Sequence, residues 1–446
     1  MGSKCTLAFV TGTLEKNFAQ GGTTPFLQAT LGGRFLRTIF CKRNKQALFA
    51  GRSHLHWLPK GVMERLPSNP NLQNLHAERS KDVEEKQDEK PMSSETKRRK
   101  ANCKSHSTEL TRNDYTVGWV CALPKEQTAA TAMLDRRHAD LLKPPNDHNT
   151  YTLGSVGKHN IVIACLPKGK VGTNPAATVM ARMVSTFPFI KFGLMVGIGG
   201  GIPPKVRLGD VVVSTPVDQF PGVVEWDSGK VKQGGNFERT GALNNPPIAL
   251  LTAVTKLETK HELNGSKIPE YLDELKQKWP RLASKYIRSD SLQDVLFKPE
   301  YGHVSESITD CAAIPDNDGG DEKGESCRFC DRTQTIKRKP RDMRVHYGLI
   351  ASGNQVIKDA KFRDTLNKSL DGNVLCVEME AAGLIDDFPC IIIRGICDYA
   401  DSHKNKDWQE HAAAVAAAFA KELLSVVPVQ EVEQMPTIES KGPSVS

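Results

Sequence analysis

The sequence predicts an α/β fold built around a mainly parallel sheet. From about residue 113 onward, apolar runs of strand length alternate with segments of helical pattern, which is typical of βαβ units. A glycine-rich segment follows one apolar run, and acidic residues follow others. Open α/β sheets bind ligands at the carboxyl ends of their strands, so we expect a ligand site there.

The 446-residue chain carries its excess positive charge in its N-terminal part. Residues 1–110 hold 19 Lys and Arg against 10 Asp and Glu, whereas the whole chain has a net charge of +8. We expect residues 1–112 to be a basic, largely disordered extension and linker, because residues 76–112 have few large apolar side chains. The rest carries no basic excess, so nothing in it predicts binding to nucleic acid.

The start of the chain fits several targeting patterns. Met1–Thr6 has the pattern of an N-myristoylation signal, and residues 1–63 contain a single acid, Glu15, as mitochondrial presequences do. The basic run at 97–100 is compatible with a nuclear signal. A disordered leader also explains these features. No run of 18 apolar residues predicts a transmembrane helix, and we expect a cytoplasmic protein, with mitochondrial and nuclear locations as alternatives.

The first part of the domain is expected to hold four strands and two helices. The second helix should have Asn174 as its cap and Pro175 in its first turn. The expected strands are 116–123, 159–165, 192–197 and 210–214, and the expected helices are 126–134 and 174–183.

Residues 225–340 interrupt this alternation, and we interpret them as an insertion of helices and loops in the same domain, which ends near residue 428. A loose tail over 429–446 should follow. The insertion should hold helices at 250–259 and 269–278 and a flexible loop at 314–322; strands at 345–353, 374–377 and 391–393 and a helix at 408–424 should complete the domain.

Cys327 and Cys330 form a CxxC pair, with Cys311 and His303 nearby in the sequence. A zinc site usually needs four ligands at paired spacings. Because the chain has one CxxC pair, we favour a redox or incidental pair and predict no metal.

A glycine-rich turn is predicted at Gly197–Pro203, with Gly199, Gly200 and Gly201 at its centre. Glycines there would let a ligand lie against bare backbone. The pattern is not GxGxxG and no Walker lysine follows, so neither a dinucleotide nor a nucleoside triphosphate is indicated. A tight turn without a ligand remains the alternative.

Acidic residues follow three of the predicted strands. Glu126 comes after the first, Glu378 and Glu380 after 374–377, and Asp398 after 391–393. Such a set can bind sugar hydroxyls with one carboxylate and transfer a proton with another, which is what cleavage of a bond between a sugar and a base requires. Glu126 taken alone is better explained as an ordinary acid at a helix N-terminus, where the helix dipole favours it.

Five motifs in this order resemble the nucleoside phosphorylase/nucleosidase superfamily, in particular methylthioadenosine/adenosylhomocysteine nucleosidases and the nucleoside-phosphorylase-like domains of filamentous fungi. The resemblance covers about residues 113–427 apart from the insertion. It implies a three-layer sandwich around a mostly parallel, partly closed mixed sheet, and a homo-oligomer. The motifs are the strand before Glu126, the glycine turn, Leu208–Ser214, Val377–Ala382 and Arg394–Asp401.

The resemblance also implies roles for individual residues toward a small-molecule purine nucleoside. Asp398 would be the general acid that protonates purine N7, and Glu126 would position or deprotonate the attacking water, with Arg394 near it. The substrate-binding residues would be Glu380 on the ribose hydroxyls, Met379 on the sugar, the glycine turn, and the segment of Asn354, Val356 and Ile357 along the base edge.

The nucleophile stays open between water and phosphate. Phosphorylases of the superfamily hold phosphate with an arginine before the glycine turn and a serine within it, and these positions are Met195 and Ile198 here. We therefore favour hydrolysis without a cofactor. Lys125, Lys170 and Arg394 keep phosphorolysis as the alternative, with inorganic phosphate as co-substrate. A nucleoside-sensing module without turnover is the second alternative, and the preferred nucleoside is not determined.

Overall fold

The computed structural model describes residues 29–31, 34–41, 46–51, 54–58, 110–304 and 327–438. The chain divides into two compact units, residues 1–102 and 103–446. In the first unit, strands β1 (Ala29–Leu31), β2 (Arg34–Cys41), β3 (Gln46–Gly51) and β4 (His54–Leu58) form an antiparallel sheet in chain order. These strands were not predicted from the sequence. The targeting patterns at 1–6 and 97–100 lie outside the described residues.

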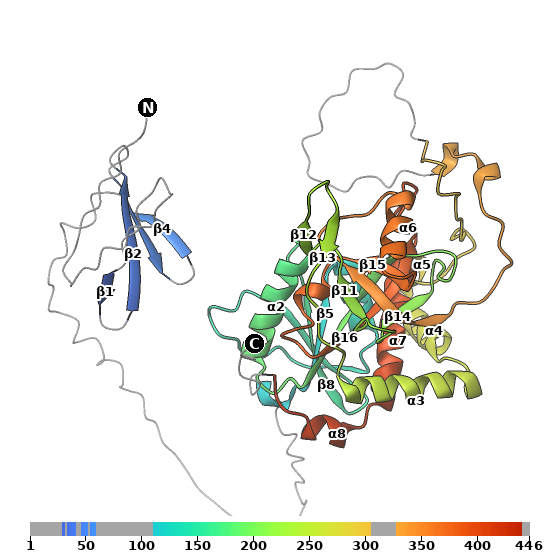
Figure 1. Cartoon of the computed structure of the whole chain (residues 1–446). Helices are drawn as coiled ribbons and strands as arrows, with labels where there is room; N and C mark the ends of the chain where they lie inside the picture. The colour runs from blue at the N-terminus through green and yellow to red at the C-terminus, as the bar shows by residue number, and fades with distance from the viewer. Residues whose placement is uncertain are drawn as a thin grey trace, which may run out of the picture. The chain divides into compact units, whose positions relative to one another are not determined.

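The second unit is organised around a sheet of ten strands (Figure 1). The order of neighbours is β11-β14-β10-β16-β9-β5-β8-β7-β6, and β15 joins β14 to β9. The strands are β5 (Val117–Cys121), β6 (Arg136–Arg137), β7 (Tyr151–Val156), β8 (His159–Cys165), β9 (Phe192–Gly201), β10 (Val211–Ser214), β11 (Val223–Glu225), β14 (Val345–Ser352), β15 (Val374–Glu378) and β16 (Cys390–Asp398).

Because β15 pairs with both β14 and β9, the strands β9, β16, β10, β14 and β15 close into a ring, while β5 to β8 extend as an open sheet. Most pairs are parallel, and the antiparallel pairs are β10 with β16, β15 with β9, and the edge formed by β6, β7 and β8. The predicted mostly parallel, partly closed mixed sheet is confirmed.

Helices cover both faces of this sheet and give three layers. One core contains side chains from α1 (Pro124–Ala132), α3 (Ile248–Asn264), α4 (Ile268–Lys278) and α7 (Gln409–Val426), and a second core on the other face contains α2 (Thr173–Thr186). Alanines of α7 allow a close approach to β16, where a Cβ on Gly395 would lie 1.9 Å from the carbonyl oxygen of Ala412. None of the described helices is long and apolar enough to span a bilayer.

The insertion holds the hairpin β12 (Gly229–Val231) and β13 (Phe237–Arg239), the helices α3, α4 and α5 (Pro280–Tyr286), and the short turns η2 (Cys327–Phe329) and η3 (Arg332–Gln334). The two predicted helices are confirmed as α3 and α4, which pack on α7. The loop predicted at 314–322 lies outside the described residues.

The predicted loose tail is wrong for residues 429–438. Helix α8 (Val429–Gln434) buries Val432, and the carbonyl of Met435 accepts a hydrogen bond from Nζ of Lys191 at 2.7 Å. Val432 packs in one of the two cores and Ile438 in the other. The burial of these apolar side chains stabilises the segment, and a polar tail would lack this packing.

The predicted glycine turn is part of a strand. Gly199, Gly200 and Gly201 continue β9, and Gly200 pairs with Val377 of β15 and with Asp398 of β16. Glycine is required because β9 runs so close to both neighbours that a Cβ on Gly200 would lie 2.9 Å from Oδ1 of Asp398. These residues therefore bring two strand ends together.

Candidate active site

Three strands, β9, β15 and β16, and the residues that follow β5 contribute to the lining of a cavity of about 230 Å³. This volume lies below the roughly 300–1,000 Å³ usual for ligand pockets and fits one small molecule. Eight of the residues predicted from the sequence line it: Glu126, Gly199, Gly200, Val356, Ile357, Met379, Glu380 and Asp398.

Glu126 lies in the first turn of α1, and its carboxylate is held by three backbone amides. Oε2 accepts hydrogen bonds from Ala122 and Leu123 at 2.7 and 2.9 Å, and Oε1 accepts one from Ile198 at 2.8 Å. Gly197 provides the room, since a Cβ there would lie 2.5 Å from Oε1. Burial raises the pKa of Glu126, and Arg394 and the amides oppose the shift. The carboxylate is thus fixed against β9 at the cavity wall.

Arg394 is fully buried and joins the acids of β15 and its following turn. Its Nη2 donates to Oε2 of Glu378 and lies 3.3 Å from Oε2 of Glu380. Burial lowers the pKa of Arg394, but the neighbouring carboxylates, first Glu378, raise it more. The guanidinium is therefore the buried countercharge for these acids.

Glu380 lies at the other end of this network. Burial raises its pKa to about 7, with Glu378 adding to the shift and Arg394 opposing it. Its Oε1 accepts a hydrogen bond from the amide of Gly172 at 3.3 Å. Near neutral pH, Glu380 therefore changes charge, and in its ionised form it can accept two hydroxyl hydrogen bonds.

Asp398 ends β16 and has a cationic partner. Its Oδ1 accepts a hydrogen bond from the amide of Ala400 at 2.8 Å, and its Oδ2 lies 3.0 Å from Nζ of Lys404. Burial lowers the pKa of Lys404, but the charge of Asp398 raises it more. The pair places a proton-carrying ammonium and a carboxylate side by side in the cavity wall.

Three predicted site residues do not line the cavity. Arg394 lies behind it, in contact with the acids. A Cβ on Gly201 would face the core, 2.7 Å from Cγ2 of Ile396, and the contact of Gly201 with the substrate stays a prediction. The side chain of Asn354 caps helix α2 instead: its Oδ1 accepts hydrogen bonds from the amide and hydroxyl of Thr173 at 3.1 and 3.0 Å.

This cap also corrects the predicted start of α2. The helix begins at Thr173 after the cap residue Gly172, and Asn174 lies inside it. A side chain 181 residues away in sequence satisfies the first helical amide, that of Thr173, which local sequence does not reveal.

Lys404 and Gln409 also line the cavity and were not predicted from the sequence. Glu378, another lining residue, was named among the acids at the strand ends but was given no role of its own. Lys404 lies in a polar loop with no pattern that distinguishes it from a solvated lysine. Lys404 lies six residues after Asp398, and the loop between them turns back so that the two side chains meet. This turn of the loop, which the sequence does not show, brings Lys404 into the site.

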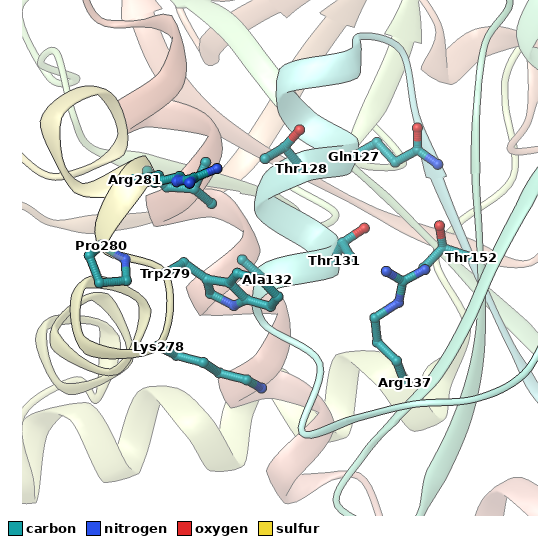
Figure 2. Close-up of a pocket in the computed structure, with 11 residues that line it drawn as sticks. Gln127, Thr128, Thr131, Ala132, Arg137, Thr152, Lys278, Trp279, Pro280 and Arg281 are labelled. Atoms are coloured by element: carbon teal, nitrogen blue, oxygen red, sulfur yellow. The ribbon is translucent and has the colours of Figure 1, made fainter.

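The largest of the described cavities, about 660 Å³, lies between α1 and the segment that joins α4 to α5 (Figure 2). It contains the basic side chains of Arg137, Lys278 and Arg281 and no carboxylate. None of the acids predicted from the sequence reaches it, so it lacks groups for acid–base chemistry on a neutral ligand.

Within the described residues, His303, Cys327 and Cys330 form a cluster in which one donor atom of each lies within 4.8 Å of the others. The CxxC spacing of Cys327 and Cys330 predicted a redox or incidental pair without metal. Cys311, named with them, lies outside the described residues.

Comparisons with known proteins found relatives of two kinds, an NLR-like protein and nucleosidases. No protein-family model matches the chain. A nucleotide-binding leucine-rich repeat (NLR)-like protein of Hyaloscypha variabilis is 46% identical over 325 residues, which cover 72% of this chain and 30% of that protein. The chain therefore matches less than a third of the length of this relative.

A 5′-methylthioadenosine/S-adenosylhomocysteine nucleosidase of Mycobacterium bovis is 23% identical over 324 residues, covering 70% of this chain and 97% of the nucleosidase. A crystal structure of the Helicobacter pylori nucleosidase of the same name covers 70% of this chain and 99% of that chain, with a TM-score of 0.44 and 15% identity. The mycobacterial protein carries the name of the nucleosidases that the motifs resemble, and its similarity to this chain extends over nearly its full length.

Proposed function

We propose that this chain cleaves the N-glycosidic bond of a purine nucleoside, with water as the nucleophile and without a cofactor. The observation that carries the proposal is the meeting of Glu126, Glu380 and Asp398 at one small cavity. The similarity to a nucleosidase over nearly its whole length supports cleavage of a nucleoside.

The ribose would lie against Met379 and Glu380. Glu380 in its ionised form would accept hydrogen bonds from the ribose hydroxyls. As the base departs, positive charge develops on the sugar ring, and the carboxylates of the wall stabilise that charge electrostatically. Binding would thus favour the transition state over the substrate.

The base would face the pair of Asp398 and Lys404, next to Val356 and Ile357. Proton donation to the base by this pair would remove the negative charge that cleavage leaves on the leaving group. Glu126, held by three amides on the opposite wall, would orient the attacking water and accept its proton, since burial raises its pKa.

The charges around the cavity favour water over phosphate. Its lining contains four acids, Glu126, Glu378, Glu380 and Asp398, and among the lining residues that the structure describes Lys404 is the one cation. Lys125, named from the sequence as a phosphate ligand, pairs instead with Glu410 at 2.9 Å, and Lys170 is exposed outside the lining. A phosphate dianion would meet net repulsion there.

A nucleoside sensor without turnover is the second candidate. It is favoured by the 46% identity to an NLR-like protein and by the ion pair of Asp398 with Lys404 at 3.0 Å, which a binding site can use without turnover. Against it stands the complete set of acids, which binding alone does not need.

The substitution Asp398→Asn separates the two candidates. We expect turnover to fall by about 10²–10⁴-fold, because the proton donor is lost, while nucleoside binding by calorimetry stays measurable. Asp387→Asn, at an exposed carboxylate outside the cavity, is the matched control and should keep full activity. Binding of a nucleoside by the wild-type chain with no base release would favour the sensor.

A further inference from the structure

We infer that the insertion carries a zinc site formed by Nδ1 of His303 and the Sγ atoms of Cys327 and Cys330. The three donor atoms lie together in the described part of the insertion, and neither cysteine is in a disulfide. This site is separate from the residues assigned to nucleoside cleavage, and the inference does not depend on that function.

The distances match a tetrahedral zinc centre. With Zn–S bonds of about 2.3 Å and Zn–N bonds of about 2.0–2.1 Å, sulfur and nitrogen ligands lie roughly 3.6 Å apart. Nδ1 of His303 lies 3.7 Å from Sγ of Cys327 and 3.3 Å from Sγ of Cys330. One ion between the three atoms would therefore reach each of them with little movement.

The local backbone is built for this arrangement. Cys327–Phe329 form the 3₁₀ turn η2, in which side chains three residues apart lie on the same side. The amide of Val304 points at Sγ of Cys330 at 3.5 Å, as amides do toward metal-bound thiolates whose charge they stabilise. A redox pair needs two thiols but no imidazole at ligand distance, so the position of His303 favours the metal.

The donor set selects zinc among common ions. Two thiolates and one imidazole are soft and borderline ligands, which suit Zn²⁺ and not Mg²⁺ or Ca²⁺. The three donors fill three corners of a tetrahedron, and the fourth corner is left to water or to another donor of the chain.

The cluster is joined to the loop that follows Asp398. The amide of His303 donates to Oγ of Ser402 at 3.0 Å, and the ring of His403 stacks on Phe297 with centroids 3.9 Å apart. The same loop carries Lys404, the partner of Asp398. Zinc would therefore fix the segment 399–408, which connects the insertion to the cavity.

The test is the metal content of the full chain, purified under reducing conditions without a metal-binding tag and dialysed against dilute Zn²⁺. We expect about one zinc per chain by elemental mass spectrometry. After exchange of Zn²⁺ for Co²⁺, the absorption spectrum should show the bands of tetrahedral Co²⁺ and thiolate charge-transfer bands. Loss of zinc is expected in the double variant Cys327→Ser, Cys330→Ser. Cys165→Ser, a half-buried cysteine of β8, is the matched control and should keep the zinc.

A wild-type chain that holds no zinc after this dialysis, or a double variant that holds as much as the wild type, would overturn the inference. The wild-type result decides the question even if the double variant fails to fold. The link to the loop has its own measurement: removal of zinc by a chelator should speed amide hydrogen exchange in 399–408, and unchanged exchange there would contradict the anchoring.

Discussion

The two walls of the cavity are built in different ways. On the wall assigned to the sugar and water, Arg394 is fully buried in β16 and is surrounded by Glu126, Glu378 and Glu380. On the wall assigned to the base, Asp398 at the end of β16 is paired with Lys404, whose side chain is 26% exposed and lies on a loop. The first wall is a charge network inside the fold, and the second combines a strand end with a loop.

The difference predicts separate consequences of mutation. Removing a partner inside the buried network leaves charges without compensation in a medium that solvates them poorly, which costs stability. Removing the loop lysine exposes its partner to solvent and changes chemistry more than folding. The loss of stability should therefore be largest for substitutions in the buried network and smallest for substitution of the loop lysine.

Arg394→Met should have the largest effect. The variant leaves Glu378 and Glu380 buried without their cation, and we expect the free energy of unfolding to fall by about 3–5 kcal/mol, measured by urea denaturation. Arg137→Met, on the exposed strand β6, is the matched control and should change stability by less than about 0.5 kcal/mol. Equal free energies of unfolding for the two variants would show that the ion pairs of Arg394 do not stabilise the fold.

The pH dependence of stability should report the same wall. Folded Glu380 keeps its proton up to a pKa of about 7, whereas its ordinary value is 4.5. Between these values the folded chain binds more protons than the unfolded chain, so the free energy of unfolding falls as pH rises, by up to about 3 kcal/mol. Glu380→Gln should flatten this fall in denaturation measured at pH 5 and pH 8. An identical slope in wild type and variant would remove Glu380 as its source.

Lys404→Met should have the smallest effect on stability and a specific effect on activity. The substitution removes the cation that lies 3.0 Å from Oδ2 of Asp398 together with the proton that it carries, so we expect base release to fall by about 10²-fold. Stability should change little, because the lysine is partly exposed. Lys168→Met, an exposed lysine outside the cavity lining, serves as the control. Base release by the variant at the rate of the wild type would exclude Lys404 from proton transfer.

The sequence predicted what depends on local pattern. Runs such as His159–Cys165 are apolar over the length of a strand, and the structure has β8 at these residues. The pattern failed at Gly199–Gly201, because glycine marks both turns and strands that pass close to other backbone. The choice between them depends on β15 and β16, which are nearly 200 residues away in sequence.

The candidate site shows the same contrast between local sequence patterns, which were predicted, and tertiary contacts, which were not. Glu126, Glu380 and Asp398 were found because each belongs to a motif at a strand end. The backbone of the segment with Asn354 was assigned to the base edge, and the structure adds that the Asn354 side chain caps α2, 181 residues away in sequence. Lys404 was missed altogether, because its contact with Asp398 depends on the course of the loop between them. Neither contact has a local pattern that reveals it.

The most direct test of the account is the product of nucleoside cleavage by the full chain in buffers with and without inorganic phosphate. Adenosine, inosine and methylthioadenosine are the substrates, and chromatography separates the base from the sugar product. An acid-lined cavity that uses water predicts free base and free ribose sugar at the same rate in both buffers. Base release that needs phosphate and yields a sugar 1-phosphate would contradict it.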